Sequence, residues 1–108
     1  MSRSAGLLVL LGLILTSQLR AQEAGDVRSG QALARRVCAA CHAVTNGQTN
    51  SPDPNAPSFE QLAHVPGMTA LALTVALQTS HTTMPNLMLS PDELRDVTAY
   101  ITSLRESP

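Results

Sequence analysis

The sequence predicts a small all-α domain, and three observations support this. Apolar residues recur at spacings of three, four and seven in several segments, which is the periodicity of helices that bury one face. No segment shows the alternation of a strand over a useful length. The chain has no tryptophan, one phenylalanine and one tyrosine, so the large rings that usually fill a core are nearly absent. At 108 residues, such a core needs help from a disulfide, a metal or a cofactor.

Residues 1–21 are predicted to be a signal peptide. Arg3 supplies a positive charge before an uncharged apolar run of 11 residues. A membrane-spanning helix needs roughly 20 such residues, so an uncleaved anchor is the weaker interpretation. Cleavage after Ala21, or alternatively after Ala24, leaves a single mature domain at residues 22–108, which we expect to be soluble and periplasmic.

The first helix of the mature domain is predicted to cover Asp26 to Cys41. Either Asp26 or Ser29 is placed to act as its N-cap. Its apolar positions follow helical spacing: Val27, Leu33, Ala34, Val37 and Cys41.

The middle of the mature chain is predicted to hold a long loop and two helices. The segment from Asn46 to Pro57 contains three prolines and a glycine and no large apolar residue, so it can form neither a regular helix nor a central strand. Ser58 and Gln61 then form a capping-box pattern at the start of a short helix. Thr69 is placed to cap a further helix that is rich in alanine and leucine and covers Ala70 to Thr79.

The last part of the chain is predicted to be an extended loop followed by a closing helix. The segment from His81 to Leu89 contains Pro85 and shows no helical period. Ser90, Pro91 and Glu93 then supply an N-cap, a proline at the first helical position and a glutamate at the third. Helical spacing continues through the apolar residues Leu94, Val97, Tyr100, Ile101 and Leu104.

Cys38, Cys41 and His42 form a Cys-x-x-Cys-His pattern, which is the pattern for attachment of haem c. On a helical turn these positions stand in an i, i+3, i+4 relation, so two thiols and one imidazole project from one face. The thiols can add to the two vinyl groups of a haem as thioethers, while the imidazole presents a nitrogen to the iron.

Three other interpretations of this motif are weaker. A Cys38–Cys41 disulfide of the thioredoxin type would need a βαβ context, which the chain lacks. A zinc site would need two more ligands, and His64 and His81 lie too far along the chain for a Cys2His2 spacing. A chance match without haem is disfavoured by the export signal, because thioether attachment takes place outside the cytosol.

The order of these motifs resembles a small bacterial class I c-type cytochrome. The resemblance rests on the first helix with its Cys-x-x-Cys-His motif, the loop Ala56-Pro57-Ser58-Phe59, the segment Met84-Pro85-Asn86 and the apolar spacing of the closing helix. It implies a fold of three to four helices around one covalently attached haem c. The first and last helices would cross, with Gly30 facing Tyr100.

The resemblance also implies how His42 is oriented and which residue is the second axial ligand. The carbonyl of Pro57 would accept a hydrogen bond from the second ring nitrogen of His42 and fix the orientation of this ligand. Met84 is expected to be the sixth ligand, because a thioether is a suitable soft ligand for iron. Met88 and His81 are the alternatives for this position. Otherwise we expect Met68 and Met88 to fill the core.

With both axial positions filled, the chain is expected to carry single electrons between respiratory or dehydrogenase partners and not to be an enzyme. Alternatives are a haem c subunit of an exported dehydrogenase and, more weakly, a gas-binding or sensing haem protein. The mature chain would carry five arginines, no lysine and eight carboxylates, a formal net charge of −3, which argues against nucleic acid as a partner. We expect no membrane association after cleavage, and a monomer or a subunit of a complex.

Overall fold

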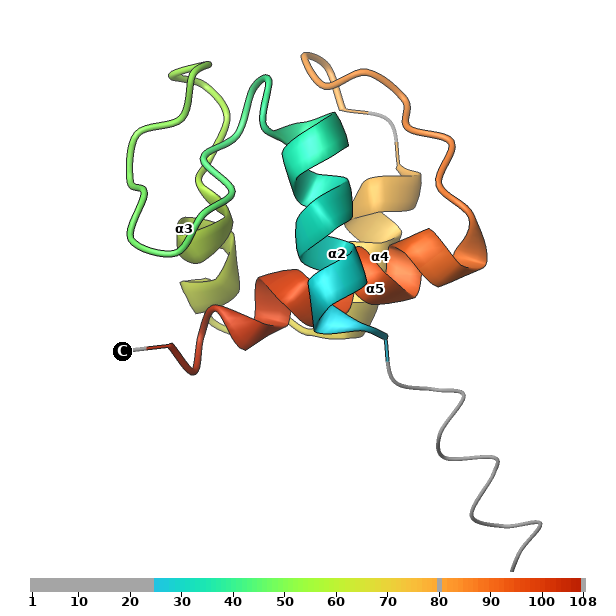
Figure 1. Cartoon of the computed structure of the whole chain (residues 1–108). Helices are drawn as coiled ribbons and strands as arrows, with labels where there is room; N and C mark the ends of the chain where they lie inside the picture. The colour runs from blue at the N-terminus through green and yellow to red at the C-terminus, as the bar shows by residue number, and fades with distance from the viewer. Residues whose placement is uncertain (1–24, 80, 108) are drawn as a thin grey trace, which may run out of the picture.

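The computed structural model describes residues 25–79 and 81–107, and every regular element in these ranges is helical (Figure 1). The predicted signal peptide and both cleavage sites lie outside the described residues. The elements in chain order are α2 (Val27–Leu33), η1 (Ala34–Cys38), α3 (Phe59–His64), α4 (Ala70–Gln78) and α5 (Pro91–Ser103). None of the described helices is long and apolar enough to cross a membrane. The all-α class is therefore confirmed.

The first helix begins where it was predicted but ends three residues early. The carboxylate of Asp26 caps α2 by accepting a hydrogen bond from the backbone nitrogen of Ser29 at 2.7 Å. After Leu33 the backbone widens into the π-helical turn η1, in which the nitrogen of Ala39 bonds to the carbonyl of Ala34 at 3.0 Å. The prediction of a continuous helix to Cys41 was wrong, because η1 ends at Cys38 and a tight turn follows.

The first and last helices cross at a glycine, as the resemblance implied (Figure 1). A Cβ atom on Gly30 would lie 1.9 Å from the backbone oxygen of Asp96 and 2.9 Å from the Cβ of Tyr100. A second contact joins the same elements, since the nitrogen of Asp26 donates to a carboxylate oxygen of Asp96 at 2.7 Å. Only a residue without a side chain allows the two backbones to approach this closely.

The predicted caps of the later helices are all present. Ser58 and Gln61 form the two reciprocal hydrogen bonds of a capping box at the start of α3. Thr69 caps α4 through the nitrogen of Ala72 at 3.1 Å. Ser90 and Glu93 form a second capping box at the start of α5. Because each cap satisfies backbone donors that the helix leaves free, these termini are set by local sequence.

The buried core lies where α2, η1, α3 and α5 meet, with α4 contributing Leu73. Its largest members are Leu33, Phe59, Leu73, Val97, Tyr100, Ile101 and Leu104. Two polar contacts fix the closing helix to the rest: the Tyr100 hydroxyl donates to the carbonyl of Val44, and Arg105 donates to the carbonyl of Ala63 at 2.8 Å. Val27 and Val37, which share the apolar spacing of the first helix, lie outside the core and are 44% and 40% exposed.

Candidate functional site

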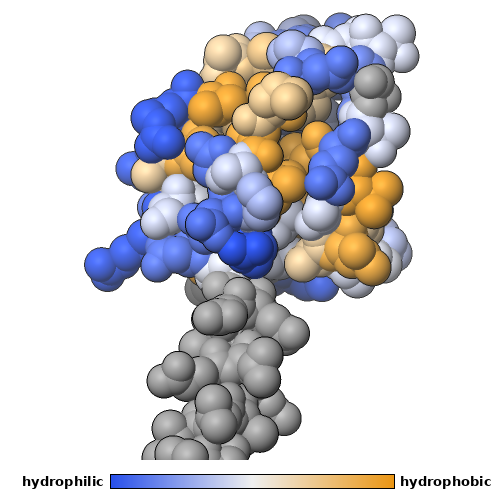
Figure 2. Space-filling model, turned by 90° about the vertical axis from the view of Figure 1, so that its right-hand side faces the viewer, coloured by the Kyte–Doolittle hydropathy of each residue, from blue (hydrophilic) through white to orange (hydrophobic). Residues whose placement is uncertain are grey.

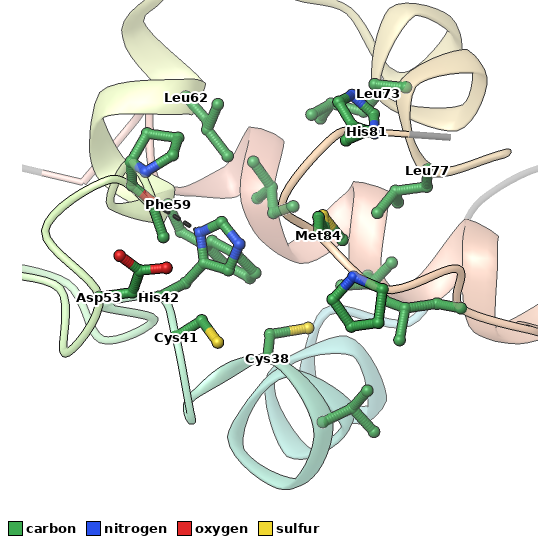
Figure 3. Close-up of a pocket in the computed structure, with 18 of the residues that line it drawn as sticks. Cys38, Cys41, His42, Asp53, Phe59, Leu62, Leu73, Leu77, His81 and Met84 are labelled. Atoms are coloured by element: carbon green, nitrogen blue, oxygen red, sulfur yellow. Dashed lines mark hydrogen bonds between the residues drawn. The ribbon is translucent and has the colours of Figure 1, made fainter. Parts of the chain in front are cut away.

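A cavity of about 320 Å³ lies between η1, the loop before α3, helix α4 and the loop that follows α4 (Figure 3). Most of its walls are apolar, and they include Val37, Leu62, Leu73, Leu77, Leu89, Val97 and Ile101. The exposed flank of Val37 therefore faces this cavity rather than the core, which explains its apolar character. A cavity of this size with few polar groups is typical of a cofactor or ligand site.

Cys38, Cys41 and His42 all line this cavity. Cys38 ends η1 and is buried, whereas Cys41 lies on the next turn and is exposed, and no disulfide joins them. The nitrogens of Cys41 and His42 bond to the carbonyl of Cys38 at 3.1 and 2.9 Å, so one helix-like turn holds the three residues together. Burial raises the pKa of the Cys38 thiol above its ordinary value.

The imidazole of His42 is held in one orientation. Its Nδ1 lies 2.7 Å from the carbonyl oxygen of Pro57, as the dashed line in Figure 3 marks, and its ring packs at 5.5 Å against the ring of Phe59. A carbonyl oxygen can only accept, so Nδ1 carries the proton and Nε2 keeps its lone pair. Nε2 is thereby left as the ring nitrogen that can bind a metal.

Met84 and His81 come from the loop after α4 and line the same cavity. Figure 3 shows Met84 on the opposite wall from His42, with Pro85 lining the cavity beside it. Met84 is half-buried. Both the expected sixth ligand and one of its two alternatives are thus at the cavity.

Met88, the other alternative, lies outside the cavity and is 95% exposed. The expectation that it fills the core was therefore wrong. In a loop without a helical period, the sequence does not indicate which apolar residues turn inward. Met68, by contrast, packs against the core and lines the cavity. His64 is exposed and bonds through Nδ1 to the carbonyl of Glu60 at 2.8 Å, outside the cavity.

Asp53 also lines the cavity, which the sequence analysis missed. Its nitrogen bonds to the carbonyl of Cys41 at 3.1 Å, and its carboxylate accepts a hydrogen bond from the nitrogen of Asn55 at 2.9 Å. The Asp-Pro-Asn sequence is a signal for such a turn, but it does not reveal that the turn lies beside the Cys-x-x-Cys-His motif.

The donor set of this cavity fits a haem c. Two thiols and an imidazole with a free Nε2 lie on one side, a thioether lies on the other, and the remaining walls are mainly apolar. These are the groups that thioether attachment and two axial bonds require.

Comparison with known proteins gives two findings. The model of a family described as cytochrome c oxidase, cbb3-type, subunit III, matches residues 25–101. The chain is also 38% identical over 97 residues to cytochrome c-552 of Bradyrhizobium diazoefficiens, an alignment that covers 90% of this chain and 92% of that protein. No solved structure is significantly similar to the chain.

Proposed function

The chain belongs to the class I c-type cytochromes and carries one covalently bound haem c, and on this premise we propose that it is an exported one-electron carrier. The observation that carries the proposal is the placement of His42 and Met84 on opposite walls of one apolar cavity. When bound there, the haem supplies an iron that changes between its ferrous and ferric states by one electron.

In this proposal Cys38 and Cys41 attach the cofactor. Their position on one turn, tied by the hydrogen bonds of Cys41 and His42 to the carbonyl of Cys38, brings both sulfurs to the same wall as the imidazole. The small side chains of Ala39 and Ala40 let a flat ring lie close to the backbone.

His42 is proposed as the proximal ligand and Pro57 as the residue that orients it. The 2.7 Å contact between Nδ1 and the Pro57 carbonyl keeps the proton on Nδ1 and leaves the lone pair on Nε2. Packing of the ring against Phe59 restricts rotation of the imidazole. The ligand is therefore oriented by the protein before any bond to a metal forms.

Met84 is proposed as the distal ligand. A thioether opposite a histidine raises the reduction potential, and apolar walls that exclude water raise it further. If His42 and Met84 both bind the iron, no position is left for a substrate, and the chain would act as a carrier rather than as an enzyme. The partners are an electron donor and an electron acceptor protein.

A second candidate is a haem c subunit of a larger redox complex, such as a dehydrogenase. The observation in its favour is that the description of the matched family names a subunit of an oxidase. Gel filtration of a native extract separates the two, since a carrier elutes as a small protein and a subunit elutes with its complex.

Export is supported by the arginine and the apolar run at the start of the chain. The mass of the purified protein, together with its reduced pyridine-haem spectrum, tests export and attachment at once. We expect a chain that begins after Ala21 or Ala24 and carries one haem through two thioethers. A reduced protein that binds carbon monoxide readily would contradict the carrier and favour a gas-binding protein.

A further inference from the structure

One continuous part of the chain carries no charged side chain. The 27 residues from 65 to 91, which form α4 and the loop that leads to α5, contain no aspartate, glutamate, lysine or arginine. Among the described residues, all the charged side chains lie at positions 26–60 and 92–106. This distribution separates a charged part of the chain from an uncharged one.

The uncharged part exposes apolar side chains. Leu71 and Val75 stand one turn apart on α4 and are 73% and 56% exposed, and Met88 is 95% exposed. Gln78 continues the same helix face, and with Met88 it lines a shallow depression of about 230 Å³. We call Leu71, Val75, Gln78 and Met88 the uncharged face. The loop between α4 and α5 lies on the side of the molecule that Figure 2 shows, and apolar residues gather there with hydrophilic residues between and around them.

A cofactor in the main cavity does not cover this face, because none of its four residues lines that cavity. The face nevertheless borders the cavity. Leu87 and Leu89 line both the cavity and the shallow depression, so one stretch of loop separates them. A helix that is apolar on most of its surface, as α4 is, is usually buried by a partner.

We propose that the uncharged face is the surface on which a redox partner protein docks, and that the contact surface of this partner is apolar and free of charged groups. The inference rests on the proposed carrier function. A charged group of the partner buried here would lose its hydration and find no opposite charge within residues 65–91. The chemistry of the face therefore selects an uncharged surface, and association through it is not steered by charge.

Two other occupants fit the face less well. A lipid surface is usually bound through lysines and arginines that flank the apolar residues, whereas this chain has no lysine and its described arginines lie outside the uncharged part. A permanent dimer would cover the loop beside the cavity in both copies and leave no route for electron exchange there.

The test introduces a single positive charge on the face of the haem-loaded protein. Leu71→Lys and Met88→Lys are compared with Val27→Lys, a control that replaces a valine 44% exposed at the start of α2. The readout is the second-order rate constant for oxidation of the reduced protein by membranes from the organism that encodes it, in about 20 to 500 mM sodium chloride.

We expect the rate constant of the unmodified protein to change less than about twofold over this range, because no charge is screened at the contact. Leu71→Lys and Met88→Lys should each lower it about tenfold, and Val27→Lys should leave it unchanged. Ferricyanide, a small anionic oxidant that needs no docking surface, should oxidise none of the variants more slowly than the unmodified protein.

A strong salt dependence of the unmodified protein, or an equal loss of rate in Val27→Lys, overturns the docking surface and leaves the carrier function intact. Failure of the membranes to oxidise any of the proteins, with ferricyanide oxidation intact, overturns the carrier function and the partner together. If the protein sediments as a dimer and Leu71→Lys dissociates this dimer, the face binds a second copy of the chain instead of a partner protein. If the protein binds phosphatidylglycerol vesicles and Leu71→Asp abolishes this binding, the face binds lipid instead of a partner protein.

Discussion

The two walls of the cavity differ in how firmly the protein holds them. On the wall of His42, the imidazole bonds to Pro57 and packs on Phe59, which lies 6.4 Å from the ring of Tyr100. Tyr100 in turn bonds to the carbonyl of Val44. On the wall of Met84, no hydrogen bond joins the described residues 81–89 to any other described residue.

This difference indicates that the His42 wall is part of the fold, whereas the Met84 wall depends on what fills the cavity. A loop with few hydrogen bonds opens at a low free energy unless another contact holds it. In the proposed carrier that contact is the bond from Met84. Substitutions on the His42 wall should therefore destabilise the whole domain. Substitutions on the Met84 wall should alter ligand binding and the reduction potential and leave the fold intact.

The largest effect is expected when the attachment is removed, because the cavity then loses its occupant. We predict that replacing Cys38 and Cys41 together by alanine prevents folded protein from accumulating. An apolar cavity of about 320 Å³ is too large to leave empty in so small a domain. The measurement is the yield and the circular dichroism of the exported chain. Recovery of a helical protein with a cooperative thermal transition would show that both walls stand without the cofactor.

Gly30→Val tests the crossing of α2 and α5, where Gly30 contacts Tyr100. Its Cβ would meet the backbone oxygen of Asp96 at 1.9 Å, so the variant should lose about 3 kcal/mol of unfolding free energy, near the upper end for overpacking. The visible spectrum should not change. Arg28→Val, on the same helix at an exposed position, serves as the control. A denaturation midpoint equal to that of the control would contradict a tight crossing.

Met84→Ala tests the loosely held wall. The haem should remain attached, the distal position should open to carbon monoxide, and the reduction potential should fall, while the domain loses less unfolding free energy than in Gly30→Val. Loss of the thioether-to-iron absorption of the oxidised protein is the spectroscopic measurement. Met68→Leu and Met88→Leu are controls that should keep this absorption.

Two outcomes would change the ligand assignment. If Met84→Ala keeps the absorption and Met88→Leu loses it, Met88 is the ligand. If the Met84→Ala protein does not bind carbon monoxide, but a double variant in which His81 is also replaced by alanine does, His81 takes the vacated ligand position. His81 lines the cavity, which allows this.

The smallest effect is expected at the entrance to α2. The hydrogen bond from Ser29 holds the pKa of the Asp26 carboxyl below its ordinary value of 3.8. Since the folded pKa is the lower one, this carboxylate stabilises the fold above about pH 4 and stops doing so as the pH falls through the folded pKa. Asp26→Asn should therefore flatten the dependence of the urea midpoint on pH in the acid range. An unchanged acid dependence in this variant would contradict the assignment.

The helix starts could be predicted because capping is local chemistry. Ser58, Thr69 and Ser90 cap the helices that their sequences indicate, and the loop before Pro57 has the composition of a loop. The Cys-x-x-Cys-His motif likewise predicts its own shared face, which the turn after η1 retains.

The sequence does not predict in the same way which side chains face the core and which face solvent. The widened turn η1 ends the first helix early, and no residue type in that segment indicates it. Met88 was expected inside and lies outside, and the apolar sequence of α4 predicts a helix without showing that Leu71 and Val75 face solvent. Such facts depend on which elements pack together, which periodicity alone does not give.

Tyr100 gives this molecule a separate optical signal for each of its two parts. It is the only tyrosine in a chain without tryptophan, its ring is 4% exposed, and its hydroxyl bonds to Val44. Its fluorescence therefore reports on the junction of the closing helix with the rest of the domain, while the visible bands report on the cavity. Recording both during unfolding would follow the firm and the loose wall in a single sample, without any added label.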